Sequence, residues 1–180
     1  MKKRNVLLGV TGSIAAYKAC DIVRRLQDKD CDVSVVMTAC AEKFVTPLTF
    51  EALSRGPVYR EMFSSTTSAE WDMAHISLAK WADAFVIAPA TANMIGKLAS
   101  GIADDLLTCT AVAMKAPILI APAMNTDMLT ARVVQDNIVR LKKYGIKFIE
   151  PQTGRLACGD VGIGALADVD VIVKTVVALF

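Results

Sequence analysis

Histidine and clustered cysteines are almost absent from this chain of 180 residues. The single histidine is His75, and the five cysteines include no C-x-x-C pair. A protein zinc site needs several clustered His, Cys or carboxylate ligands, so we expect no metal centre. An odd number of cysteines without paired spacing is typical of the reducing cytoplasm, not of a disulfide-stapled secreted domain. The sequence therefore predicts a cytoplasmic protein without a metal.

Long apolar runs and a strong excess of one charge are lacking as well. No stretch approaches the ~20 apolar residues of a membrane span. The chain has 20 basic and 18 acidic residues, a net charge of +2, so it offers no broad basic surface for nucleic acid or an acidic membrane. Residues 1–4 are basic enough to open a secretory signal, but Thr11-Gly12-Ser13 breaks the apolar run that follows. We expect no nucleic-acid partner, no membrane association and no secretion.

The chain has more apolar residues than one small domain usually hides. Hydrophobic residues make up 54%, and counting glycine but not tyrosine gives about 58%, against about 45–50% in typical soluble domains. The length suits one domain, and no linker or internal repeat interrupts it. We therefore expect a single domain over residues 1–180 that forms a homo-oligomer and buries its apolar excess at a subunit interface.

Residues 6–18 organise the rest of the chain. The short apolar run Val6–Val10 predicts a buried strand, Gly12 permits a tight turn, and Ser13 is a good N-cap for the helix that follows. A helix start presents unpaired N–H groups and partial positive charge, which suit a phosphate. The positions of Gly9, Gly12 and Ser13 do not give the dinucleotide fingerprint. Two interpretations stay open here: a turn that holds the phosphate of a cofactor, or a strand–turn–helix unit that binds nothing.

Strand-like and helix-like segments alternate along the rest of the chain. A polar loop is expected at residues 64–68, and residues 151–164 are rich in glycine with little apolar periodicity. This alternation predicts an α/β fold of three layers, with a parallel sheet and helices on both faces. The expected strands are 6–10, 32–37, 84–88, 118–121 and 147–149, and the expected helices are 14–26, 47–53, 75–81, 94–113 with a break near Gly101, 132–144 and 168–179.

Candidate functional residues stand where the strands of such a sheet end, which is where ligands collect. Thr38 follows the second strand, where a dinucleotide enzyme usually has an acid, so it indicates either a mononucleotide or simple capping of the strand. Asn125 is either a turn residue or a neutral amide donor for a carboxylate. His75 is either a helix-start histidine with a satisfied hydrogen bond or a base that works near neutral pH.

Cys158 differs from the other cysteines in its surroundings. Cys20 and Cys109 fall on apolar helix faces and are expected in the core. Cys158 lies in the glycine-rich segment, which we expect to be a loop without helix or strand. A loop of this length is more often a lid or another functional loop. We therefore expect an accessible, functional thiol on a substrate lid at about residues 151–165.

Five segments that carry these candidates occur in a fixed order over nearly the whole chain. They are Gly12-Ser13-Ile14-Ala15-Ala16-Tyr17-Lys18, His75, Pro89-Ala90-Thr91-Ala92-Asn93, Pro122-Ala123-Met124-Asn125 and Leu156-Ala157-Cys158-Gly159-Asp160. Together they resemble the homo-oligomeric flavin-containing cysteine decarboxylases. The segment around Cys158 favours the branch of coenzyme A biosynthesis, which acts on phosphopantothenoylcysteine, over the branch that acts on peptides.

The resemblance implies FMN as cofactor and a fold of the flavodoxin-like or Rossmann-like type. It also implies trimers, sometimes assembled into dodecamers, with active sites between subunits. It implies that His75 is the catalytic base, that Asn125 holds the substrate carboxylate and that Cys158 donates a proton from the lid. It also implies a wider set of contacts: Gly12, Ser13, Thr38, Phe44, Pro89, Ala90, Thr91 and Ala92 toward FMN, and Met124, Ala157 and Gly159, beside Asn125, toward the substrate.

Two positions depart from the pattern of many relatives. Leu129 stands where they have a tryptophan, so we expect altered packing near the cofactor or an interface. Ala165 stands where many bacterial members have an arginine, which weakens a phosphate contact there. Many bacterial members are fused to a synthetase that makes the substrate, so this chain, which stops at Phe180, is expected to be monofunctional or cut from such a fusion.

Four other functions fit parts of the same pattern. A peptidyl-cysteine decarboxylase and a flavin prenyltransferase share the superfamily. A non-catalytic regulatory flavoprotein shares the fold, but such proteins can lose catalytic residues, whereas His75, Asn125 and Cys158 are all present here. A flavodoxin-type electron carrier fits the fold but not a thiol on a lid.

Overall fold

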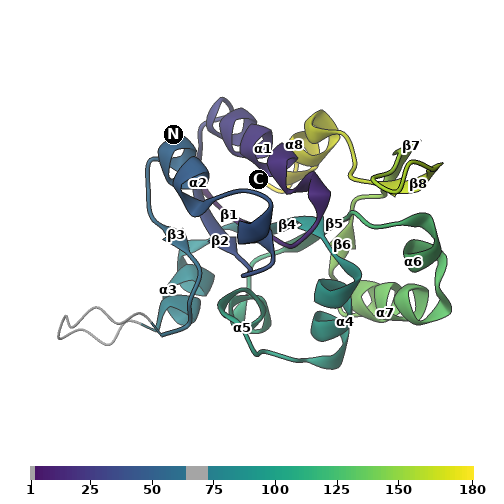
Figure 1. Ribbon diagram of the computed structural model, residues 1–180. Helices are drawn as coiled ribbons and strands as arrows, with labels where there is room; N and C mark the ends of the chain where they lie inside the picture. The colour runs from purple at the N-terminus through teal and green to yellow at the C-terminus, as the bar shows by residue number, and fades with distance from the viewer. Residues whose placement is uncertain (1–2, 64–72) are drawn as a thin grey trace.

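A six-stranded parallel sheet forms the centre of the computed structural model, which describes residues 3–63 and 73–180 (Figure 1). The spatial order is β3-β2-β1-β4-β5-β6, and every neighbouring pair runs parallel. This confirms the predicted α/β class, and of the two types named above the strand order is the Rossmann one. The strands are β1 (Arg4–Val10), β2 (Cys31–Met37), β3 (Val58–Tyr59), β4 (Ala84–Ala90), β5 (Ile118–Pro122) and β6 (Lys147–Phe148).

Helices cover both faces of the sheet and make the three predicted layers (Figure 1). One face carries α1 (Lys18–Gln27), α2 (Pro47–Ser54) and α8 (Val169–Val177); the other carries α3 (Ala74–Trp81), α4 (Ala92–Ser100), α5 (Leu106–Ala113) and α7 (Arg132–Lys143). Short elements at the carboxyl edge of the sheet are the 3₁₀ helices η1 (Ile14–Tyr17) and η2 (Ala41–Lys43) and the helix α6 (Thr126–Thr130).

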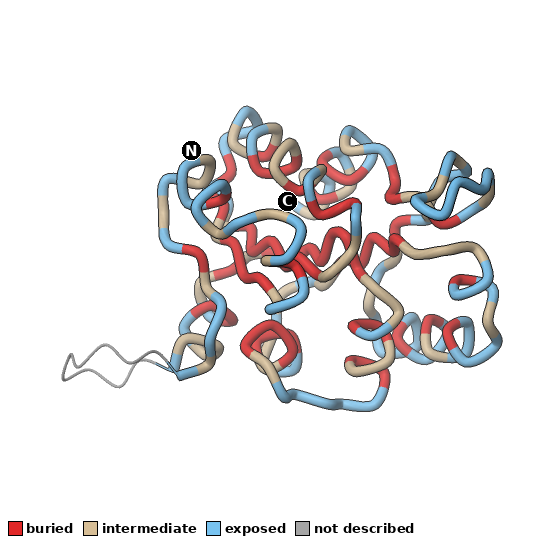
Figure 2. The backbone as a smooth tube through the Cα atoms, viewed as in Figure 1, coloured by how far each residue is buried: buried red, intermediate tan, exposed pale blue. Residues whose placement is uncertain are grey.

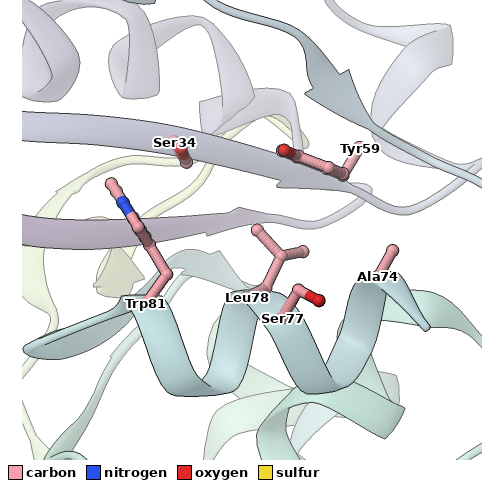
Figure 3. A pocket seen from close by; sticks show the side chains of 6 residues that line it. All are labelled: Ser34, Tyr59, Ala74, Ser77, Leu78 and Trp81. Carbon is pink, nitrogen blue, oxygen red and sulfur yellow. The ribbon is translucent and has the colours of Figure 1, made fainter. Parts of the chain in front are cut away.

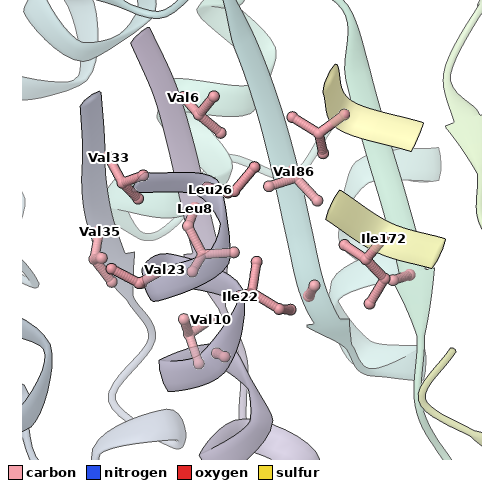
Figure 4. Packing of buried hydrophobic residues seen from close by; sticks show 14 of the residues in the cluster. Val6, Leu8, Val10, Ile22, Val23, Leu26, Val33, Val35, Val86 and Ile172 are labelled. Atoms are coloured by element: carbon pink, nitrogen blue, oxygen red, sulfur yellow. The ribbon is translucent and has the colours of Figure 1, made fainter. Parts of the chain in front are cut away.

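Two apolar clusters, one on each face of the sheet, form the core. Residues alternate along β1, so that Val6, Leu8 and Val10 pack against α1 (Figure 4) while Leu7 packs on the opposite layer. A strand covered on both faces has no polar side, which explains why the predicted strands are continuous apolar runs. The buried residues accordingly concentrate in the sheet and on the inner sides of the helices (Figure 2).

Several boundaries differ from the sequence predictions. The first turn after Ser13 is the 3₁₀ helix η1, and only then does α1 begin. The predicted break near Gly101 separates α4 from α5: Gly101 has a φ of 68°, and Asp105 starts α5 with a capping box to Thr108. The short elements β3 and α6 had no predicted counterpart. The polar loop predicted at residues 64–68 lies outside the described residues.

The prediction that residues 151–164 lack regular structure is wrong. They form an antiparallel hairpin of β7 (Gln152–Arg155) and β8 (Val161–Ala165). Apolar alternation was absent because both strands are short and largely exposed, so their stability comes from backbone pairing and not from a buried face. In residues 3–63 and 73–180, no helix has the length and apolar content needed to cross a membrane.

Candidate active site

The order of the strands reverses between β1 and β4. The chain moves outward from β1 to β2 and β3, then crosses back to place β4 on the other side of β1. At such a switch point the connections leave in opposite directions and open a crevice at the carboxyl ends of the two strands. η1 follows β1 and α4 follows β4, so two helix starts border the same crevice.

Thr11 joins these two strand ends. Its side chain is buried, its Oγ1 donates to the carbonyl of Pro89 at 2.7 Å, and the same oxygen accepts the N–H of Thr91 at 3.1 Å. The backbone N–H of Thr11 also donates to the Pro89 carbonyl, at 3.3 Å, next to a cis peptide bond between Ala88 and Pro89. Sequence reasoning missed Thr11, although a threonine directly after a buried strand was a usable signal.

Gly12 is required for a reason other than the predicted tight turn. Its φ is not in the left-handed region, but a Cβ at this position would collide with the Cβ of Cys40. η2 therefore packs directly onto the backbone of the turn. The glycine brings two segments together instead of supplying an unusual backbone conformation.

Ser13 and Thr91 start the two helices that border the crevice. The Ser13 Oγ accepts from the N–H of Ala15 at 3.3 Å, and the Thr91 Oγ1 accepts from the N–H of Met94 at 3.3 Å. Thr38 acts in the same way at the end of β2, where its Oγ1 accepts from Ala41, so the capping interpretation of Thr38 holds. The helix N-termini suit an anion.

The other predicted cofactor residues lie at the end of β4, at the start of α4 and at the end of η2. Pro89 and Ala90 are buried at the end of β4, and Ala92 is half-buried at the start of α4. Phe44 ends η2 and remains 48% exposed, which leaves an aromatic surface available to a ligand.

Asn125 follows β5 and uses the two ends of its amide differently. Its Oδ1 accepts from the N–H of Asp127 at 2.7 Å and so caps α6. Its Nδ2 donates to the Sγ of Cys158 at 3.5 Å. The turn role of Asn125 is confirmed, and it fixes the amide so that its donor end faces the thiol.

The β7–β8 hairpin docks on the segment that carries Asn125. The N–H of Met124 donates to the carbonyl of Gly164 at 3.0 Å, and the Thr126 Oγ1 donates to the carbonyl of Ile163 at 2.8 Å. The hairpin approaches so closely that a Cβ at Gly164 would collide with the Met124 carbonyl oxygen, and one at Gly162 with the Thr126 hydroxyl. Gly162 and Gly164 thus serve the docking of a structured hairpin.

A Gly164→Ala variant is expected to detach the hairpin. Gly164 has a φ of 134°, and the added methyl group also meets the Met124 carbonyl, so we expect the free energy of unfolding to fall by about 1–3 kcal/mol. Denaturant titration measures that loss, and limited proteolysis reports the release of the hairpin. Gly154→Ala is the matched control, because its Cβ would make only an ordinary contact, 3.6 Å from Ala165. Equal stability and proteolysis of the two variants would contradict the docking role.

Cys158 lies in the turn between β7 and β8 and is exposed, as expected of a functional thiol. Its Sγ donates to the Oδ2 of Asp160 at 3.3 Å. The turn is closed by its own backbone: Leu156 N–H donates to the Asp160 carbonyl, and Gly159 N–H to the Leu156 carbonyl. Ala157 and Gly159, which flank the thiol, are also exposed.

Burial distinguishes three of the four other thiols from Cys158. It raises the pKa of Cys20, Cys31 and Cys109 above the usual thiol value, so these groups stay protonated. Cys20 and Cys109 are half-buried, not fully in the core as predicted. Cys40 and Cys158 are the two exposed thiols. Among the described residues, no three His, Cys, Asp or Glu side chains gather into a group that could hold a metal.

His75 lies near the start of α3, away from the other candidates. A cleft of about 170 Å³ separates α3 from β2 and β3, and Figure 3 shows the α3 side chains that point into it. His75 is half-buried on the flank of that helix and does not line the cleft. The cleft is lined by Ser34, Tyr59, Ala74, Ser77, Leu78 and Trp81.

One chain does not bring His75 to Asn125 and Cys158. The cleft places α3 against β2 and β3, whereas Asn125 follows β5 and the hairpin, which follows β6, docks beside Asn125 (Figure 1). β2 and β5 are three strand spacings apart, or about 14 Å. The predicted residues thus fall into three groups along one edge of the sheet: His75 on one side, the crevice in the centre, and the pair Asn125–Cys158 on the other side.

The two departing positions lie on the Asn125 side. Leu129 is buried and lines a cleft of about 390 Å³ that also borders α7, β6 and Ile163 of the hairpin. Ala165 ends β8 opposite Gln152.

Comparison with known proteins gives one family and a consistent set of relatives. The family model described as Flavoprotein matches residues 1–180. The coenzyme A biosynthesis bifunctional protein CoaBC of Bacillus subtilis is 51% identical over 97% of this chain, but this chain covers only 42% of that protein. A probable phosphopantothenoylcysteine decarboxylase of Streptococcus mutans is 46% identical, with 96% of this chain and 97% of that protein covered.

Solved structures agree with these relatives. A mutant PPC decarboxylase complexed with pantothenoylaminoethenethiol superposes with a TM-score of 0.86 at 35% identity, with 98% of both chains covered. The FMN-dependent cysteine decarboxylase SpaF superposes with a TM-score of 0.83 at 32% identity, with 98% of this chain and 97% of that chain covered.

Proposed function

Because the chain belongs to the flavoprotein family, we propose that it binds FMN and decarboxylates phosphopantothenoylcysteine to phosphopantetheine, a step of coenzyme A biosynthesis. The observation that carries the proposal is the contact between Asn125 and Cys158. Decarboxylation removes a carboxylate from Cα, and the same carbon must then receive a proton. The Asn125 amide can donate a hydrogen bond to the carboxylate, and the Cys158 thiol can supply the proton. Because these two groups lie 3.5 Å apart, both can act at the same carbon.

The crevice between β1 and β4 fits a flavin mononucleotide. Gly12 leaves no Cβ between the turn and η2, and the helix starts at Ser13 and Thr91 suit a phosphate. The exposed ring of Phe44 and the segment from Pro89 to Ala92, with its small side chains, suit the flat ring system of the flavin. These residues, with Thr38, are the ones we assign to the cofactor.

Cysteine decarboxylation needs an electron sink, because the bare thiol cannot stabilise the carbanion left by CO₂. Bound FMN supplies reversible hydride chemistry, which lets the side chain pass through a thioaldehyde and return to a saturated thiol. His75 takes the thiol proton near neutral pH. Asn125 holds the carboxylate without a positive charge, which would stabilise the substrate more than the transition state. Cys158 returns a proton at Cα, and Met124, Ala157 and Gly159 line the substrate beside it.

The separation of the three groups supports a site built by two chains. The thiol proton and the Cα proton belong to atoms of one substrate that are only two bonds apart, yet His75 lies beside β2 and β3 and the Asn125–Cys158 pair lies beyond β5. A second copy that brings its His75 to this pair would complete the site. We therefore propose a homo-oligomer, a trimer or dodecamer, and sedimentation at micromolar concentration tests it: a monomer would contradict the proposal.

The relatives also support a link to a synthetase. This chain spans about two fifths of the length of the bifunctional relatives, so the second activity named for them would belong to another segment or another protein. We propose that phosphopantothenoylcysteine reaches the site from such a synthetase, and that both work in the cytoplasm.

Mass spectrometry of the products tests the proposed reaction. The purified yellow protein is incubated with phosphopantothenoylcysteine, and loss of one CO₂ alone is expected. Loss of CO₂ together with two hydrogens would support decarboxylation but contradict the role of Cys158. No product from this substrate, but product from a peptide with a C-terminal cysteine or a modified flavin from a prenyl phosphate, would replace the proposal.

A further inference from the structure

We infer that Asp160 is a positioning residue that holds the Cys158 thiol for its proton transfer. This rests on the proposed function and extends it to a residue that has no role in the scheme above. The Oδ2 of Asp160 accepts a hydrogen bond from the Cys158 Sγ at 3.3 Å, while the Asn125 Nδ2 donates to the same sulfur at 3.5 Å. The sulfur is thus held between one donor and one acceptor.

The backbone of the turn brings the Asp160 carboxylate next to the Cys158 thiol. The bond from Leu156 N–H to the Asp160 carbonyl, 2.8 Å long, closes the hairpin around residues 157–159. Gly159 has a φ of 97°, a conformation that side chains rarely adopt, and it lets the chain reverse between the two residues. Cys158 and Asp160 therefore stand next to each other because of the turn backbone, and a glycine between them is needed for the contact.

The carboxylate has no competing use in the part of the chain that the structure describes. Asp160 takes part in none of the ion pairs among residues 3–63 and 73–180, and the thiol is its one hydrogen-bonded side-chain partner there. Arg155, the only basic residue of the hairpin, makes no ion pair with it. A carboxylate can accept from this sulfur only while the sulfur carries its hydrogen, so the contact belongs to the protonated thiol that the proton transfer requires.

Substrate binding leaves Asp160 as the remaining anchor of the thiol. Asn125 has one donor group facing the sulfur, and a substrate carboxylate would take it. Without Asp160, the sulfur would then rotate freely about its Cα–Cβ bond. Fewer decarboxylated intermediates would be protonated before they leave, so more product would appear as the oxidised enethiol.

The experiment compares three variants of the full chain. Asp160→Ala removes the hydrogen-bond acceptor. Asp160→Asn keeps an amide oxygen that can accept a hydrogen bond from the Cys158 S–H group. Val161→Thr is the control and alters an exposed neighbour of Asp160. We expect Asp160→Ala to raise the ratio of enethiol to saturated product about tenfold, the effect of one lost hydrogen bond, with CO₂ release within about twofold of the unmodified chain. Asp160→Asn and Val161→Thr should stay near the unmodified ratio.

A second measurement does not depend on turnover. The rate at which iodoacetamide alkylates Cys158, followed by peptide mass spectrometry, should rise about threefold to tenfold in Asp160→Ala and little in Asp160→Asn. An unchanged alkylation rate and product ratio in Asp160→Ala would overturn the inference, as would equal defects in Asp160→Ala and Asp160→Asn. If the unmodified chain releases no CO₂ from phosphopantothenoylcysteine, the proposed function fails instead, and the alkylation rates still decide whether Asp160 holds the thiol.

Discussion

A Cys158→Ser variant is expected to release CO₂ but to stop at the oxidised enethiol. A serine hydroxyl is a much weaker acid than a thiol, so the step that returns a proton to Cα should slow by about 10²–10⁴-fold, the usual contribution of a positioned acid. Mass spectrometry under saturating substrate distinguishes the product that lacks two hydrogens from the saturated thiol.

A matched control separates this result from a folding defect. Cys40→Ser changes the other exposed thiol, which contacts the turn at Gly12 through its Cβ, an atom that serine keeps. That variant should make the saturated product at an unchanged rate and keep its flavin. If Cys158→Ser also yields the saturated product at a normal rate, the thiol is not the proton donor.

A His75→Asn variant should keep its flavin and lose turnover. Removing the base that takes the thiol proton is expected to lower kcat by about 10²–10⁴-fold, since the hydride step requires that proton to leave. Visible absorbance of the purified protein measures retained flavin, and CO₂ release measures turnover. Normal turnover with the asparagine in place would remove His75 from the mechanism.

Mixing two chains that each fail to make the saturated product tests whether the site spans a subunit interface. If His75 of one chain works with Cys158 of another, co-refolded His75→Asn and Cys158→Ser chains contain sites with both groups intact. Random pairing across a head-to-tail interface gives roughly one such site in four, so saturated product should reappear at about a quarter of the unmodified rate. No recovery in mixed oligomers would place both groups in the same chain.

The sequence predicts the regular part of the fold well, for a physical reason. Strands covered on both faces must be apolar throughout, so β1, β4 and β5 stand out as short runs, and Ser13, Thr91 and Gly101 mark helix ends by local chemistry. The hairpin at residues 152–165 has neither signal. Its strands are exposed, and Gly162 and Gly164 are required by contacts with Thr126 and Met124, which are distant in sequence.

In the candidate site, too, roles set by neighbouring residues can be predicted from the sequence, whereas contacts between distant segments cannot. Residues whose role is local, such as Thr38 as a cap and Asn125 as the first residue before α6, can be predicted from their neighbours. Two contacts cannot be predicted in this way. The hydrogen bond from Thr11 to Pro89, which we call the Thr11 clasp, joins residues 78 positions apart, and the packing of Cys40 on Gly12 joins residues 28 positions apart. No local sequence pattern indicates either contact. The roles of His75, Cys158 and the assigned FMN contacts remain predictions for the experiments above.

The Thr11 clasp has a consequence for how a cofactor would enter. Its hydrogen bonds join β1 and β4 by groups of the chain itself, so folding alone sets the width of the crevice. The loss of backbone freedom at the two strand ends then occurs during folding and not during cofactor binding. Such a preorganised crevice should bind and release FMN without rearrangement, so that the apoprotein and the holoprotein should have the same backbone conformation.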